Sequence, residues 1–115
     1  MTYKVEIFRE SSPINIRVSN ELEFLGMPII AKGQIEQVRE GADGRLVCNA
    51  TGDPPPLITW QRNGVRIETG MRYVVEKDAL NVKQVKVADS GIYVCTATNE
   101  AGTDQQAFTL EVISE

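Results

Sequence analysis

The side chains in this chain that could do chemistry are two cysteines, Cys48 and Cys95, and a scattering of carboxylates. The 115-residue sequence contains no histidine, which excludes the Ser-His and Cys-His pairs that activate a nucleophile. A structural zinc site needs about four Cys or His ligands, so two cysteines are too few. They can instead form one disulfide, whose pairing leaves no choice. We therefore expect neither an enzyme nor a cofactor.

The charged residues also argue against a ligand site. Twelve basic and 16 acidic residues give a net charge of −4. They are interspersed, whereas nucleic-acid binding needs a basic stripe and anionic lipid needs a polybasic patch. Glu76 with Asp78, or Asp43 beside Glu40, are too few for calcium, which takes roughly six to eight oxygens. We expect solvated carboxylates, no metal and no nucleic-acid partner.

Asn49, Ala50 and Thr51 form an N-glycosylation sequon. Asn49 directly follows Cys48, so strand alternation turns Asn49 outward when the cysteine faces a core. Roughly one sequon is expected by chance in a chain with six Asn and 13 Ser or Thr residues. Asn49 is therefore a glycosylation candidate, which favours a secreted protein without establishing one.

We expect no membrane-spanning helix and no secretory signal in this sequence. No apolar run reaches the roughly 18 to 20 residues that a spanning helix needs, so we expect no direct membrane insertion. The residues after Met1 do not form a secretory signal. If the parent protein is secreted, we expect this sequence to be a piece of a longer chain.

Short alternating segments separated by turn residues must position these side chains. Their regular spacing is typical of an all-β sandwich. Gly33 interrupts the first strand, where a bulge would let the chain cross between sheets. Asn63 and Gly64 predict a two-residue hairpin turn, since both central positions of that turn need positive φ. The expected strands are 27–32 with 34–38, 45–50, 57–62, 73–75, 80–85, 93–97 and 108–112.

Residues 1–26 do not fit this pattern and are too few to fold alone. They contain two alternating runs, Tyr3 to Ile7 and Ile14 to Val18. Three interpretations stay open: the last hairpin of a preceding sandwich, a segment that pairs with an edge of the main domain, or a disordered leader. Alternating strands without a partner favour edge pairing. A weak homodimer through residues 1–26 or through an edge strand is therefore a further hypothesis.

Three motifs carry a resemblance to a known family. The first is Gly52-x-Pro54-x-Pro56-x-Ile58-x-Trp60, and the second is Arg72-Tyr73. The third is Leu80-x-Val82-x-x-Val85-x-x-x-Asp89-x-Gly91-x-Tyr93-x-Cys95-x-Ala97-x-Asn99-x-Ala101-Gly102. With these motifs, residues 27–115 resemble an immunoglobulin-like domain of the I-set. The resemblance implies a two-sheet β-sandwich with Greek-key connections.

The resemblance implies a scaffold role, and no functional-site role, for six residues. The two cysteines would join the sheets and contribute about 4 kcal/mol by closing the loop between them. The tryptophan would pack against that disulfide, and the tyrosine hydroxyl would bond to a nearby backbone group. The arginine and the aspartate would form an ion pair at one end of the sandwich. These residues are Cys48, Cys95, Trp60, Tyr93, Arg72 and Asp89.

The two expected sheet faces differ in charge. Outward positions on one face, including Ile92 and Ala107, are uncharged, while the opposite face carries Arg45, Glu76 and Lys83. Interface cores are depleted in charge, so the uncharged face is the candidate for protein contact. Valine and threonine also simply suit strands, which is the simpler interpretation. The contact candidates are Leu57, Thr59, Gln61, Val94, Thr96, Thr98 and Thr109.

The resemblance implies a non-catalytic module of a multi-domain adhesion or guidance protein, secreted or on the cell surface. It would make homophilic or heterophilic protein contacts and act as a stiff spacer, with avidity across several weak domains. Two alternatives stay open. One is an I-set link of an intracellular muscle or cytoskeletal protein, where thiols stay reduced. The other is an ectodomain segment of a receptor kinase or phosphatase.

Overall fold

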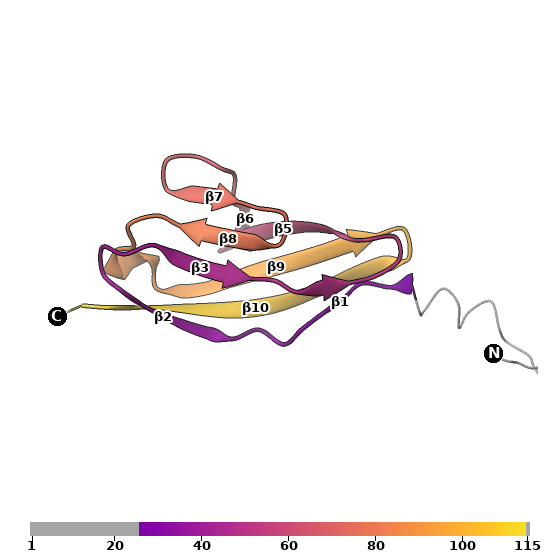
Figure 1. Ribbon diagram of the computed structural model, residues 1–115, viewed down its shortest axis with the longest axis horizontal. Helices are drawn as coiled ribbons and strands as arrows, with labels where there is room; N and C mark the ends of the chain where they lie inside the picture. The colour runs from indigo at the N-terminus through magenta and orange to yellow at the C-terminus, as the bar shows by residue number, and fades with distance from the viewer. Residues whose placement is uncertain (1–25, 115) are drawn as a thin grey trace, which may run out of the picture.

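The computed structural model describes residues 26–114, which form two β-sheet layers packed face to face (Figure 1). The larger sheet has the strand order β2-β10-β9-β5-β6. The smaller sheet has the order β3-β8-β7, and β1 pairs with β4. This arrangement confirms the predicted all-β, two-sheet sandwich. The elements are β1 (Ile29–Ile30), β2 (Ile35–Arg39), β3 (Gly44–Val47), β4 (Ala50–Thr51), β5 (Leu57–Arg62), β6 (Val65–Arg66), β7 (Tyr73–Val75), β8 (Ala79–Val82), the 3-10 turn η1 (Val87–Asp89), β9 (Gly91–Asn99) and β10 (Gly102–Ile113).

The start of the sandwich crosses from one layer to the other around Gly33, as predicted. β1 pairs with β4, whereas β2 pairs in parallel with β10 of the larger sheet. A Cβ atom on Gly33 would lie 1.9 Å from the carbonyl oxygen of Ala107, so only glycine permits this approach. Side chains of β10 hold the crossing segment. Asp104 Oδ2 accepts a hydrogen bond from Ile30 N at 2.8 Å, and Gln106 Oε1 accepts one from Gly33 N at 3.3 Å.

A disulfide and a pair of aromatic rings occupy the centre of the core. Cys48 and Cys95 are bonded, and their Cα atoms lie 6.5 Å apart. The disulfide joins β9 of the larger sheet to the residue after β3, so it links the two layers covalently. Trp60 is 1% exposed, and its ring centroid lies 5.4 Å from that of Phe108. The other buried core residues are Ile30, Val38, Leu46, Ile67, Leu80, Val82, Val85, Tyr93, Ala97 and Leu110.

Two expected strands end earlier than their alternation indicated. The segment 45–50 is divided because the chain changes partners there. Cys48 N donates to a carbonyl in the turn before β8, whereas Asn49 O accepts from the residue after β1. Val85 lies beyond β8, since Gln84 adopts a positive φ of 47° that ends the strand. Val85 is still buried and belongs to the core.

The turn between β5 and β6 has the backbone conformation that the sequence predicts. Asn63 and Gly64 have φ values of 53° and 78°, which confirms the predicted hairpin turn. The described chain starts at one end of the long axis and finishes at the other (Figure 1).

The predictions for residues 1–26 lie outside the described residues, apart from Gly26. Within residues 26–114 no helix is long and apolar enough to cross a membrane.

Candidate functional site

Tyr93 lies at the end of the sandwich that contains η1. Its hydroxyl donates to Asp89 O at 2.7 Å, the backbone contact expected of a tyrosine corner. Arg62, which the sequence analysis did not single out, donates from Nη1 to the Tyr93 hydroxyl at 3.1 Å. The guanidinium carbon lies 4.9 Å from the ring centroid. Burial raises the pKa of Tyr93 to about 12, although the charge of Arg62 acts in the opposite direction.

The ion pair between Arg72 and Asp89 closes the same end of the sandwich. Arg72 Nη2 lies 2.5 Å from Asp89 Oδ2, and the aspartate is 6% exposed. Asp89 also accepts a hydrogen bond from Lys86 N at 2.7 Å. Both contacts satisfy a buried carboxylate, which would be costly to leave unpaired. The carboxylate is thus held by two donors of its own chain, Arg72 Nη2 and Lys86 N.

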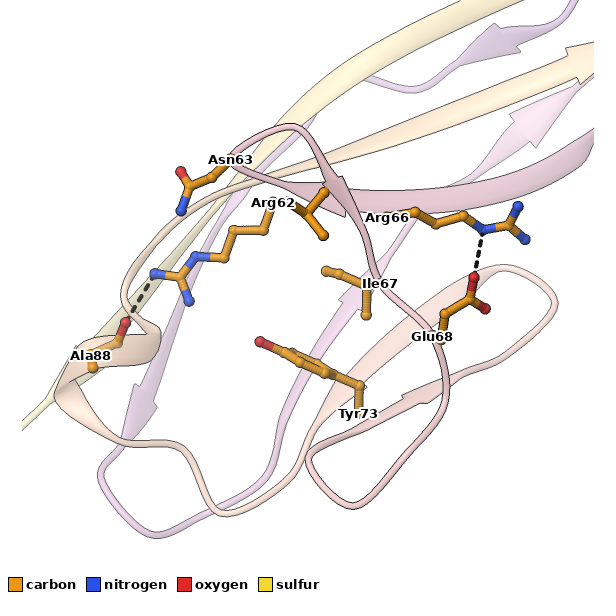
Figure 2. Close-up of a pocket in the computed structure, with 8 residues that line it drawn as sticks. Arg62, Asn63, Arg66, Ile67, Glu68, Tyr73 and Ala88 are labelled. Carbon is orange, nitrogen blue, oxygen red and sulfur yellow. Dashed lines mark hydrogen bonds and ion pairs between the residues drawn. The ribbon is translucent and has the colours of Figure 1, made fainter.

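A hollow of about 620 Å³ lies beside the β5–β6 hairpin (Figure 2). Arg62 and Arg66 are the cations there that could hold an anionic ligand. Arg62 Nη2 instead donates to the carbonyls of Ala88 and Ser90, at 2.9 and 2.8 Å. Arg66 pairs with Glu68 at 3.3 Å. Both guanidinium groups thus have partners within the chain, and in the described part of the sequence no group of three His, Cys, Asp or Glu side chains could hold a metal ion.

The outer face of the larger sheet brings the seven contact candidates together. β9 lies between β5 and β10, so that Val94 has Gln61 on one side and Ala107 on the other. Leu57 is 70% exposed, and Thr98 is also exposed. The remaining five are half-buried: Thr59, Gln61, Val94, Thr96 and Thr109.

The structure adds Ile35 to this face. The parallel pairing of β2 with β10 sets Ile35 beside Thr109, and the antiparallel pairing of β10 with β9 sets Thr109 beside Ile92. Ile35 is 63% exposed and Ile92 is 57% exposed. Ile35 could not be placed on this face from the sequence, because alternation within a strand does not reveal which layer the strand joins. We call the seven contact candidates together with Ile35, Ile92 and Ala107 the uncharged face. A charge lies at its margin, because Glu111, two residues after Thr109 on β10, is exposed and accepts a hydrogen bond from Gln37 Nε2 at 2.9 Å.

The outer face of the smaller sheet is charged and internally paired. Arg45 Nη1 lies 2.6 Å from Glu76 Oε1, and Asn81 Nδ2 donates to the other carboxylate oxygen at 2.8 Å. The hydrogen bond from Arg45 lowers the pKa of Glu76. Lys83 lies 3.5 Å from Asp43. Burying these exposed pairs in an interface would cost desolvation, so this face suits protein contact less well.

Asn49 is exposed, as the alternation predicted, and it belongs to the smaller layer between β3 and β4. A hollow of about 440 Å³ lies beside it, with Thr51, Pro55 and Lys77 among its lining residues. The sequon is therefore accessible and lies in the other layer from the uncharged face.

Comparison with known families agrees with this geometry. Residues 29–112 match the family model of the immunoglobulin I-set domain. Chicken fibroblast growth factor receptor-like 1 is 39% identical over 93 residues, which cover 78% of this chain and 19% of that protein. Human hemicentin-1 is 40% identical over 80 residues, which cover 68% of this chain and 1% of that protein. The chain thus spans a small part of the length of these relatives.

Muscle proteins and a receptor phosphatase are similar as well. Chicken smooth-muscle myosin light chain kinase is 41% identical over 69 residues, covering 56% of this chain and 4% of that protein. An immunoglobulin domain in the titin M10–obscurin-like 1 complex has a TM-score of 0.69 at 26% identity, covering 77% of this chain and 96% of that one. The Ig1-2 module of the Drosophila receptor protein tyrosine phosphatase DLAR has a TM-score of 0.68 at 28% identity, covering 75% and 45%.

Proposed function

The chain belongs to the immunoglobulin I-set family, and we propose that it is a non-catalytic protein-binding and spacer module of a multi-domain adhesion, guidance or receptor protein, secreted or on the cell surface. The contrast between the two outer faces carries this proposal. The uncharged face exposes Leu57, Ile35 and Ile92 around Val94, whereas the smaller sheet is covered by paired charges. A charge-poor centre with exposed aliphatic side chains is typical of a protein interface.

The spacer part of the proposal is supported by where the described chain starts and finishes. Its two ends lie at opposite ends of the long axis (Figure 1), so modules joined end to end would form a string. The similarity to short stretches of hemicentin-1 and fibroblast growth factor receptor-like 1 agrees with a role as one unit of a longer protein. Several weak contacts along such a string would add up through avidity.

A charge placed in the uncharged face tests the binding part. Val94→Glu puts a carboxylate at the centre of the face, and we expect it to abolish self-association and binding of the multimerised domain to cells that the parent domain labels. The matched control is Val47→Glu on the smaller sheet, where the valine is 41% exposed. The control should bind as the parent does. Sedimentation equilibrium and cell labelling measure the two effects, and circular dichroism checks that both variants fold.

Equal binding by Val94→Glu and the parent, with both folded, would refute the uncharged face as the contact surface. Loss of binding in Val47→Glu alone would indicate that the smaller sheet is the contact surface.

Asn49 supports the extracellular compartment in this proposal, because an accessible sequon can carry a glycan only in a protein that enters the secretory pathway, whether it is then secreted or held at the cell surface. The alternative is a scaffolding or elastic link of an intracellular muscle protein, favoured by the similarity to titin and myosin light chain kinase. The mass of the protein from its native source separates the two. A disulfide with a glycan on Asn49 supports the first, and free thiols without sugar support the second. A kinase or phosphatase elsewhere in the same parent chain would indicate the receptor-ectodomain alternative.

A weak homodimer through residues 1–26 or an edge strand remains part of the proposal. The open edge of β7 is already occupied, since Gly70 N donates to Tyr73 O at 2.8 Å and Val75 N donates to Thr69 Oγ1 at 2.9 Å. Among the other outer strands, β2 has five residues, β3 has four and β6 has two, so β2 offers the longest edge for pairing. The solution mass with and without residues 1–26 is the test. A dimer that becomes a monomer on truncation would assign the assembly role to those residues.

A further inference from the structure

Asn49 belongs to the lining of the hollow of about 440 Å³ beside β4. Three segments enclose this hollow: residues 48–51, the residues Pro55, Pro56 and Ile58 before and within β5, and the turn between β7 and β8. Asn49 begins the one N-glycosylation sequon in the 115 residues. A glycan on Asn49 therefore starts at the wall of a hollow, next to three segments of the chain.

The two side chains that the sequon needs have no partners in the fold. Within the described residues, neither the Asn49 carboxamide nor the Thr51 hydroxyl forms a hydrogen bond, and both residues are exposed. The carboxamides of Asn81 and Asn99, by contrast, donate to other parts of the fold. A sugar on the Asn49 nitrogen therefore breaks no contact of the folded domain.

The attachment is a glycosyl transfer that needs an activated sugar. The co-reactant is a lipid-linked oligosaccharide, whose first N-acetylglucosamine carries a pyrophosphate at its anomeric carbon. Asn49 Nδ2 forms the new bond to that carbon and gives up one proton, and the lipid pyrophosphate leaves with the electron pair of the broken C–O bond. No atom is oxidised or reduced in this step.

The hollow combines apolar walls with polar groups that lack partners. The rings of Pro55 and Pro56 and the half-buried side chain of Ile58 supply the apolar surface. Lys77 and Asp78 are exposed, and within residues 26–114 their side chains form neither an ion pair nor a hydrogen bond. Sites for small molecules typically combine these two kinds of lining. A pyranose ring matches both, because its C–H groups pack on apolar surface and its hydroxyls accept from an ammonium and donate to a carboxylate.

We propose that the first N-acetylglucosamine of a glycan on Asn49 occupies this hollow and bridges β4, the proline segment and the β7–β8 turn. A sugar tethered at the wall needs little intrinsic affinity, because its attachment has already removed the translational freedom that binding costs. The inference rests on the proposed function, since only a protein that enters the secretory pathway receives the sugar.

A second hollow, of about 210 Å³, also has Asn49 in its lining. Its cation, Arg45, is already paired with Glu76 at 2.6 Å. The larger hollow offers Lys77 and Asp78 without such partners. The sugar therefore gains more contacts in the larger hollow.

The test uses the full 115-residue chain, secreted from cells behind a cleavable signal and trimmed by an endoglycosidase to one N-acetylglucosamine on Asn49. The same oxidised chain made without the sugar is the comparison. Cys48 N donates to Asp78 O at 2.8 Å, so exchange of its amide reports on the wall of the hollow. We expect the sugar to slow this exchange about threefold to tenfold, the factor for one hydrogen bond of typical strength. NOEs should connect the N-acetyl methyl group to the Ile58 side chain.

Lys77→Ala removes a polar group of the wall, so most of the slowing should disappear in this variant. The matched control is Lys86→Ala, which changes an exposed lysine next to η1, and it should keep the full slowing. A secreted chain without sugar on Asn49, or equal exchange with and without the sugar, would overturn the proposal. NOEs to Val47 alone would place the sugar in the second hollow and overturn it equally.

These outcomes are separate from those of the proposed function. Free thiols and no sugar in protein from the native source would reject the extracellular compartment. Exchange and NOEs are measured on a chain that carries the sugar by design, so they accept or reject the sugar's place in the hollow whatever the native compartment is.

Discussion

At the residue scale, Tyr93 shows how a side chain within a recognised motif acquires its properties from partners distant in sequence. Its position two residues before Cys95 indicated a hydroxyl bonded to the backbone, and the contact with Asp89 O has that form. The contact with Arg62 joins residues 31 positions apart, and no local sequence pattern predicts it. Burial favours the neutral phenol because the phenolate would lose its hydration.

The raised pKa of Tyr93 predicts a loss of stability at alkaline pH. The folded-state pKa of about 12 lies above the ordinary value of 10.0. The neutral phenol therefore contributes stability that is fully present below about pH 10 and is lost as the pH rises toward 12. Tyr93→Phe should lower the free energy of unfolding by about 1 to 2 kcal/mol at pH 7. Urea unfolding should show the difference between parent and variant shrinking between pH 10 and 12, and a constant difference would contradict the assignment.

At the element scale, the transfer of the chain from β1 to β2 decides the composition of the uncharged face. Gly33 permits the crossing by its close approach to Ala107 O. Asp104 and Gln106 then hold the crossing segment from β10. Ile35 joins the uncharged face only because β2 belongs to the larger sheet. The break at Gly33 could be predicted from the sequence, but the layer that each part joins could not.

Substitution of Gly33 should therefore be much more harmful than substitution of a glycine in open space. Gly33→Ala forces a Cβ atom into the backbone at Ala107, and we expect a loss of about 2 kcal/mol, as for other overpacked sites. Gly70→Ala is the control, because a Cβ atom there meets nothing within 4 Å. It should leave stability unchanged or raise it by up to about 1 kcal/mol through the unfolded state. Urea midpoints compare the two, and equal effects would show that the crossing tolerates a side chain.

At the scale of the whole molecule, one covalent bond and two hydrogen-bonded ends hold the layers together. The disulfide between Cys48 and Cys95 spans 47 residues and links the layers near the middle. The Arg72–Asp89 pair and the Tyr93 contact close one end, and the hydrogen bonds from Asn99 Nδ2 to Gly26 O and Pro54 O close the other. The two layers are therefore tied together near the middle and at both ends.

Removing the disulfide should lower the stability of the whole domain and leave its fold intact. For a closed loop of this length the chain-entropy model predicts a loss of about 4 kcal/mol. Cys48→Ala with Cys95→Ala should show that loss in the free energy of unfolding from urea titrations. The parent protein reduced with a thiol reagent is the control, and it should be destabilised by a similar amount. A loss under about 1 kcal/mol in both would mean that packing around Trp60 holds the layers without the bond, in disagreement with the model.

The sequence by itself determined the all-β sandwich, the pairing of the two cysteines and the Asn63-Gly64 turn. These follow from local alternation, from turn residues with restricted φ, and from there being only two cysteines to pair. Tertiary structure alone decided the partners of Arg62, the place of Ile35 and the hydrogen bonds of Asn99. Such contacts join residues far apart in the chain, 73 positions for Asn99 and Gly26. A hydrogen bond depends on which two segments of the chain lie next to each other in space. The alternation of residues along either segment does not specify its neighbour.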